Sequence, residues 1–338
     1  ADYGALTFSG NLSGAFAFTS GGFSNSTYTG VIGSGALSVT KDGIGILTLS
    51  GDNSFTGAVT ISSGTLKLGA AGGATNTPLG TTAGITTVAT GARFDLNGYT
   101  LGTAEPLTLN GVGYGLGDFA SGALMNSSGS SVTYSGLLTL GASASSTIKA
   151  DYGDINLTAA GTITGSSALF TLGGTGTGTL SSIIGTVAGT LTKINTGTWT
   201  LSGASTFTGA TRIDAGTLKI GATGTTTNTP LGVIAGITTV SSGAVLDLNG
   251  FTLTAAEPLT VNGRGINDGG AVVNSGGALT YSGAITQATD SRITNSGSGL
   301  LTITGGVTGA FALYLGGTSN MAFSTGVLGM GAGTLTKQ

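Results

Sequence analysis

Two segments of the chain decide its fold, because they return later in the same order. Residues 45–57 read GILTLSGDNSFTG, and residues 64–69 read GTLKLG. The pattern recurs as GTWTLSGASTFTG at 197–209 and as GTLKIG at 216–221, an offset of 152 positions (197 − 45). A long internal repeat of this kind indicates a repeat architecture, in which each unit packs against its neighbours along the chain.

The repeat extends well beyond these two motifs. DLNG at 95–98, for example, returns at 247–250 with the same offset. We predict a partial unit at residues 1–34, a first full unit at 35–188 and a second at 189–338. Because no linker or change of composition separates the units, we expect one continuous solenoid over 1–338.

Composition narrows the class of protein. Gly accounts for 66 of 338 residues, as in a flexible linker, yet 39% of the chain is hydrophobic. A disordered Gly/Ser linker lacks that apolar content, so we do not expect disorder. Charged residues are only 7%, the net charge is −3, and no basic run suits nucleic acid. Cys and His are both absent, which removes disulfides, thiolate metal sites and the commonest general base. We therefore expect no cofactor, no metal site, no nucleic-acid partner and no transmembrane segment.

Short apolar alternation predicts the strands. Residues 47–49 read LTL, 59–61 read VTI and 66–68 read LKL. Apolar residues two apart share one face of a strand, while the residue between them faces outward. Strands of about 3–5 residues cannot bury an apolar face alone, so parallel coils stacked on one another provide the core. Outward Thr residues on successive coils are expected to align as ladders.

The motif also resembles a known family. Residues 45–57 with 64–69 resemble the passenger-associated β-strand repeat of bacterial autotransporters, which reads G-x-L-x-L-x-G-x-N-x-[YF]-x-G followed by G-T-L-x-[LVI]-G. The copy at 197–221 departs from it by placing Ser205 where the family has Asn. The resemblance implies a right-handed parallel β-helix at the bacterial cell surface and supplies no catalytic residues. We expect a structural extracellular protein rather than an enzyme.

The two ends of the sequence suggest self-association. Residues 333–337 (GTLTK) repeat 189–193, which the chain follows with the strand pattern of 197–203. Residues 4–10 have that same strand pattern, so the end of one copy would be continued by the beginning of another. We predict head-to-tail stacking into a filament. The interface is predicted at Leu6, Phe8, Leu335, Lys337 and Gln338. The alternative is that the 338 residues belong to a longer, adhesin-like passenger chain.

A binding loop is the second candidate site. The irregular segment 112–133 is longer than its counterpart at 264–273, and long loops are where binding residues concentrate. Tyr114, Asp118 and Phe119 are its candidate contacts, with cell-surface glycans as candidate ligands.

Two further side-chain patterns have a structural and a functional interpretation. A polysaccharide-active enzyme would need clustered carboxylates, and the closest pair outside turns is Asp151 and Asp154. The sequence around Asp151 repeats that of residues 1–4, which favours a structural turn. Asp95-Leu96-Asn97-Gly98 superficially suggests a calcium loop but lacks the further ligands, so a turn is expected there.

The aromatic residues of the motif are expected in the core. Trp199 aligns with Leu47, while Tyr28, Phe55 and Phe207 share one motif position. An aligned position that is apolar in every copy favours burial over an exposed sugar platform.

Overall fold

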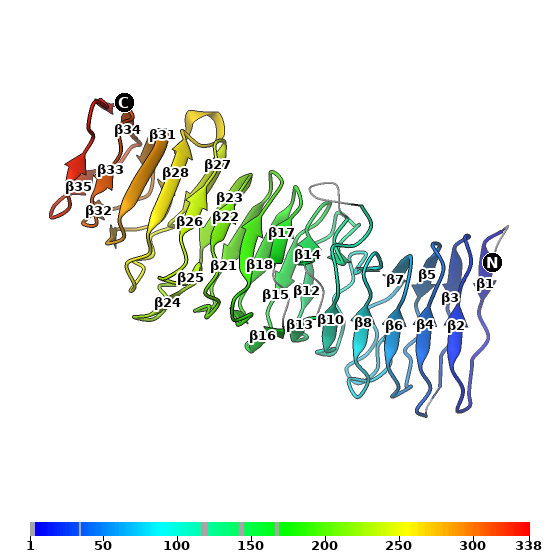
Figure 1. Ribbon diagram of the computed structural model, residues 1–338. Coiled ribbons are helices and arrows are strands. Elements are labelled where there is room, and N and C mark those ends of the chain that lie inside the picture. The colour runs from blue at the N-terminus through cyan, green and yellow to red at the C-terminus, as the bar shows by residue number, and fades with distance from the viewer. Residues whose placement is uncertain (1–3, 34, 116–120, 142–144, 166–168) are drawn as a thin grey trace. The chain divides into compact units, whose positions relative to one another are not determined.

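The computed structural model describes residues 4–33, 35–115, 121–141, 145–165 and 169–338. The chain forms two compact units, Ala1–Gly178 and Thr179–Gln338, which are described in turn. In each unit, short strands follow one another around a coil, and equivalent strands of successive coils pair in parallel (Figure 1). The fold is therefore the all-β parallel β-helix that the sequence predicts.

The first unit has three faces. Its first face comprises β2 (Phe18–Ser20), β4 (Val39–Lys41), β6 (Val59–Ile61), β8 (Thr86–Val88), β10 (Leu107–Leu109), β13 (Leu138–Leu140) and β16 (Thr162–Gly165). Its second face comprises β1 (Leu6–Phe8), β3 (Ser26–Tyr28), β5 (Ile46–Leu49), β7 (Thr65–Leu68), β9 (Arg93–Asp95), β11 (Leu124–Met125), β14 (Ser145–Lys149) and β17 (Leu169–Gly173). The third face contains β12 (Val132–Tyr134) and β15 (Ile155–Leu157).

The second unit repeats this plan. One face comprises β20 (Thr190–Lys193), β22 (Thr211–Ile213), β26 (Thr238–Val240), β28 (Leu259–Gly263), β31 (Ile285–Asn295), β33 (Val307–Thr308) and β36 (Leu328–Gly329). A second face comprises β21 (Thr198–Leu201), β23 (Gly216–Ile220), β27 (Ala244–Asp247), β29 (Val272–Asn274), the far end of β31, β34 (Leu313–Gly316) and β37 (Leu335–Lys337). The third face contains β30 (Leu279–Tyr281), β32 (Leu301–Ile303) and β35 (Met321–Phe323).

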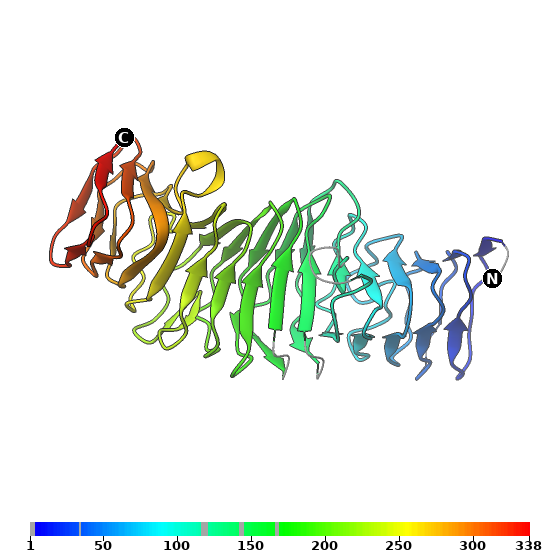
Figure 2. The same cartoon turned by 45° about the horizontal axis from the view of Figure 1, so that its top comes forward.

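The remaining elements are β18 (Thr177–Leu180), which contains the boundary between the units, β19 (Ile183–Ile184), the antiparallel pair β24 (Asn228–Thr229) and β25 (Gly232–Val233), and the 3-10 helix η2 (Ile266–Asp268). The loop that carries η2, yellow in Figures 1 and 2, projects from the coils of the second unit. Insertions in the turns therefore leave the stacked strands intact.

The alternation of the sequence sets what is buried. Val39 and Ile61, at inward positions, are fully buried, and the Thr residues between inward positions lie at the surface. Trp199, Phe55 and Phe207 are fully buried and Tyr28 nearly so, which confirms their predicted place in the core. One Thr ladder runs along the first face of the first unit through Thr19, Thr40, Thr60, Thr87, Thr108, Thr139 and Thr164.

The DLNG segments are turns, as predicted. Asn97 and Gly98 both have positive φ, 48° and 80°, and Asp95 Oδ1 accepts a hydrogen bond of 2.9 Å from the Asn97 amide. The second copy has the same bond between Asp247 and Asn249. In turns of this kind, Asp commonly accepts a hydrogen bond from the backbone amide two residues further on.

Candidate functional site

The N-terminal coil exposes side chains at positions that interior coils bury. Phe8 of β1 pairs in register with Tyr28 of β3, which pairs with Leu49 of β5. The exposed fraction falls along this row from 43% at Phe8 to 3% at Tyr28 and 0% at Leu49. Leu6 of the same strand is 54% exposed. In the described residues, no further coil lies against β1, so its inward positions face open space.

These side chains form an apolar hollow. A cavity of about 270 Å³ opens at this end of the first unit, whose N-terminal coil is blue in Figure 2. The rings of Phe8 and Tyr28 stack with centroids 5.1 Å apart, and Phe18 tilts against Tyr28 at 5.5 Å. Phe16 and Leu12 complete the apolar lining. Such a surface suits another apolar surface rather than a polar ligand.

The C-terminal coil is exposed in the same way. Leu335 of β37 is 53% exposed, whereas its register partner Leu313 is fully buried. Gln338, also a predicted interface residue, is bound within its own unit. Its Oε1 accepts hydrogen bonds from Arg292 Nη1 at 2.7 Å and from Arg264 Nη2 at 3.3 Å. Among the predicted C-terminal contacts, Leu335 therefore has the clearest surface for a partner.

Buried lysines mark the end of corresponding strands in the two copies. Lys193 Nζ donates to the carbonyl oxygens of Ile194 and Asn195, both at 2.8 Å, and of Ala215 at 3.1 Å. Lys41 makes the equivalent bonds to Asp42, Gly43 and Ser63. Burial lowers the pKa of both amines, that of Lys193 to about 7.

The third carbonyl of each lysine comes from the next coil. Lys193 is in register with Ile213, two residues before Ala215. Lys337 repeats the strand-ending position of Lys193 in the sequence, but it is exposed and donates to the Gln338 carbonyl at 3.0 Å. The strand of Lys337, β37, lies on the face of β21 rather than on that of β20, so the two lysines differ in their place on the coil.

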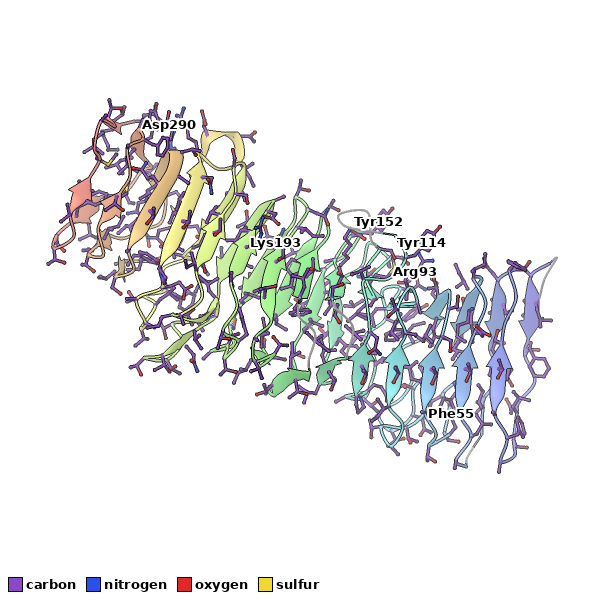
Figure 3. All side chains as sticks on the ribbon, in the orientation of Figure 1. Phe55, Arg93, Tyr114, Tyr152, Lys193 and Asp290 are labelled. Carbon is purple, nitrogen blue, oxygen red and sulfur yellow. The ribbon has the colours of Figure 1, made fainter. Side chains whose placement is uncertain are left out.

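The predicted binding loop is only partly described. Tyr114 is 73% exposed, and its backbone is fixed by hydrogen bonds in both directions with Ser121. Asp118 and Phe119 lie outside the described residues. The ring of Tyr114 borders an open cleft of about 330 Å³, which is also lined by Ile44, Ser63, Gly64, Gly91 and Arg93. Figure 3 shows Arg93 and Tyr114 together on the first unit.

Two polar atoms beside this cleft lack partners. Arg93 Cζ lies 5.9 Å from the centroid of the Tyr114 ring, and no ion pair of Arg93 is found among the described residues. Arg93 Nε and Thr65 Oγ1 are both buried without a hydrogen-bond partner in that part of the chain. Thr65 and Arg93 are register partners on β7 and β9, so the two atoms belong to one place on the solenoid.

The carboxylates have structural surroundings where the structure describes them. Asp154 Oδ1 accepts a hydrogen bond of 2.9 Å from the Thr177 amide, 23 positions further along the chain. Burial raises the pKa of Asp151. Glu105 and Glu257 are buried beneath Tyr134 and Tyr281, whose hydroxyls donate to the glutamate backbone carbonyls. No group of three metal-ligating side chains occurs among the described residues.

Sequence reasoning missed two features of these sites. The inward Lys41 and Lys193 could have been found from alternation alone, since VTK and LTK place Lys on the same side as the preceding apolar residue. Arg93 could have been found by comparing the two copies, because Val245 stands at its position in the second.

Comparison with known families agrees with the repeat. Residues 39–68 and 191–220 each match the passenger-associated-transport-repeat family. These segments contain all but the last residue of each motif copy, so the resemblance seen in the sequence is confirmed for them. No curated protein and no solved structure matches the chain.

The matched repeat and the parallel β-helix are together similar to those of an autotransporter passenger. None of the helices among the described residues has the length and apolar character needed to cross a membrane.

Proposed function

We propose that the protein is a structural β-solenoid of the bacterial surface whose end coils stack head to tail on other copies, giving a filament. The observation that carries this proposal is the exposure of Leu6, Phe8 and Leu335 at positions that interior coils bury. Fully burying one such side chain contributes about 1.5–3 kcal/mol, so covering both ends favours association. The cost of lost rotational and translational freedom opposes it.

Further coils of the same repeat type are the best occupant for these ends. The outermost strand of a β-solenoid has unpaired backbone groups on its outer edge, which another parallel strand satisfies. A coil placed beyond β37 would pair with its outer edge and would cover Leu335 at the same time.

A second copy of the chain fits the face on which the end strands lie. The strand Leu335–Lys337 (β37) repeats 191–193 in sequence, yet it continues the face of β21 and β23 rather than that of β20. The strand Leu6–Phe8 (β1) begins the face of β5 and β7, which are the counterparts of β21 and β23 in the repeat. Stacking then continues both the backbone ladder and the dry core, and this continuity is what would make the filament stiff.

The second candidate function is adhesion by a longer passenger chain, in which the same polypeptide supplies the covering coils. The open cleft beside Tyr114 favours a binding role of this kind. Both candidates use the same end surfaces, so they differ in which chain covers them.

Complementary end variants separate these candidates. F8D places a carboxylate in the N-terminal hollow, and L335D places one on the C-terminal coil. If copies stack head to tail, each variant stays monomeric at concentrations where the wild type forms long assemblies. An equimolar mixture of the two gives dimers and nothing longer, because only one competent end of each kind remains. Sedimentation velocity and electron microscopy measure these states.

The control is I237D, since Ile237 is 51% exposed but belongs to an interior coil. This variant should assemble like the wild type. A wild-type chain that stays monomeric at every concentration would overturn the proposed stacking and favour coils supplied by the same polypeptide.

A further inference from the structure

We propose that the cleft beside Arg93 and Tyr114 binds an acidic glycan, meaning a pyranose that carries a carboxylate. The guanidinium of Arg93 would take the carboxylate, and the Tyr114 ring would lie against the apolar face of the sugar. This inference is independent of the proposed stacking, because no residue of the cleft belongs to an end coil.

Arg93 has the charge and the free donors that a carboxylate needs. The other arginines are engaged: Arg212 pairs with Asp214 at 3.1 Å, Arg264 pairs with Asp268 at 3.4 Å, and Arg292 donates to Gln338. In the described part of the chain, Arg93 has no carboxylate partner, and its guanidinium lies over the Tyr114 ring. A guanidinium binds a carboxylate through two parallel N–H donors, which gives both strength and orientation.

The unpartnered atoms point to a missing ligand. Buried polar atoms in folded proteins are nearly always hydrogen-bonded, so an exception requires an explanation. Arg93 Nε and the hydroxyl of Thr65, which is 3% exposed, are two such exceptions on paired strands. A bound oxygen acceptor at the cleft would give Arg93 Nε a partner, and a water or sugar hydroxyl can do so for Thr65.

The shape of the cleft suits a sugar. Its volume of about 330 Å³ lies at the lower end of the range for small-molecule sites. Tyr114 offers an exposed aromatic face with a polar tip, and the hydrogen bonds to Ser121 hold its backbone in place. The Ser63 hydroxyl adds a polar group to the lining.

The second copy of the repeat shows that the coil does not need these residues. It keeps Gly216 and Gly243 at the positions of Gly64 and Gly91, but the positions of Arg93 and Tyr114 hold neither a cation nor an aromatic ring, and the nearby Arg264 is engaged by the Tyr314 ring at 4.1 Å. The counterparts of Ile44, Ser63, Arg93 and Tyr114, 152 positions later, are Thr196, Ala215, Val245 and Ile266. By contrast, the structural ion pair of Lys67 with Asp95 recurs as Lys219 with Asp247. The turn glycines and the ion pair are thus repeated, whereas Arg93 and Tyr114 are not. This difference is expected if the two side chains serve binding rather than the stability of the coil.

Titration with defined oligosaccharides tests this proposal. We would follow 3′-sialyllactose and a hyaluronan tetrasaccharide by saturation-transfer NMR and calorimetry, with lactose as the neutral probe and inorganic phosphate as the simple anion. Both acidic oligosaccharides, or the one whose carboxylate fits, should bind, and neither lactose nor phosphate should compete. R93V should weaken binding at least about tenfold, as expected for a lost charge-assisted hydrogen bond.

Matched variants keep the test independent of folding. R93V and Y114I introduce the residues that the second copy has at these positions, so both should leave thermal unfolding unchanged. R93K retains the charge but not the planar fork, and it should weaken binding less than R93V does. R212V removes an exposed arginine elsewhere and should bind like the wild type. Equal binding of lactose, competition by phosphate, absence of binding by either acidic oligosaccharide, or wild-type affinity in R93V would each overturn the proposal.

Discussion

Buried charges of both signs stand at repeated positions of this solenoid. Burial raises the pKa of Glu257 to about 7, although hydrogen bonds from Thr238 at 2.8 Å and Thr229 at 3.3 Å partly oppose the rise. Burial lowers the pKa of Lys193 to about 7, against an ordinary value of 10.5. Each group therefore costs stability when it carries its charge in the folded state.

The two pKa shifts predict a minimum of stability near pH 7. Glu257 binds more protons in the folded state between its ordinary pKa of 4.5 and about 7, so stability falls as pH rises through that window. Lys193 binds more protons in the unfolded state between about 7 and 10.5, so stability rises with pH there. Each change amounts to at most about 3–5 kcal/mol.

Urea unfolding at pH 5, 7 and 9 measures these effects. E257Q should reduce the loss of stability between pH 5 and 7, and K193M should reduce the gain between pH 7 and 9. K337M, which changes an exposed lysine, is the control and should follow the wild type. Profiles of E257Q and K193M that run parallel to the wild type would show that neither buried group controls the pH dependence.

At the residue scale, the sequence predicted burial better than charge. The aligned motif correctly placed Trp199, Phe55 and Phe207 in the core, because these apolar side chains stand at inward positions. Alternation places Lys193 on the inward side of its strand, but it does not show what satisfies the buried ammonium, since the three carbonyls that accept its hydrogen bonds come from a turn and a neighbouring coil. Such partners depend on register, which a strand pattern does not contain.

At the scale of strands and turns, close stacking of coils leaves some positions only to glycine. Gly216 begins β23 with a φ of +68°, and a Cβ placed on it would lie 2.4 Å from the carbonyl oxygens of Asn195 and Gly197. Gly64 has the same φ and the same crowding in the first copy. Gly243 also has a positive φ, +80°, but nothing lies within 4 Å of the position that a Cβ would occupy.

Alanine substitution separates strain from crowding. G243A should cost about 1–2 kcal/mol, because Ala must adopt a left-handed backbone conformation. G216A should cost a further 1–3 kcal/mol or so, because its methyl group also displaces backbone of the neighbouring coil. Chemical unfolding of both variants measures the difference. Equal losses would mean that the turn at Gly216 relaxes without disturbing the coil beneath it.

The sequence predicted most strands but not how they pair. Three-residue alternation gave β4, β6 and β10 directly, yet β31 runs for 11 residues through a polar stretch and serves two faces. The number of residues per coil also varies. Val59 pairs with Val39, 20 positions earlier (59 − 39), and with Thr86, 27 positions later (86 − 59). For that reason Arg93 could not be placed beside Thr65 and the Tyr114 loop from the sequence, although the loop itself could be flagged as irregular.

At the scale of the whole molecule, a repeat protein derives its stability from contacts between neighbouring units, so its terminal coils are its least stable part. The strands β1 and β37 each pair with only one strand in the described residues. Their outer amides therefore have no ladder partner and should exchange with solvent quickly. Interior strands such as β23, which pairs with both β21 and β27, should exchange slowly.

Hydrogen exchange measured by mass spectrometry across the concentration range of assembly tests how copies meet. Peptides covering 4–10 and 333–338 should exchange at least about tenfold more slowly once assemblies form, because a new parallel strand pairs with each end. The interior peptide 216–220 should not change, and F8D should show no protection of either end. If the wild type associates while its end peptides stay unprotected, the copies meet through their sides, and the Thr ladder of the first unit becomes the surface to examine. If peptides 4–10 and 333–338 are instead protected from exchange only in assemblies, the end strand of each copy pairs with the end strand of the next.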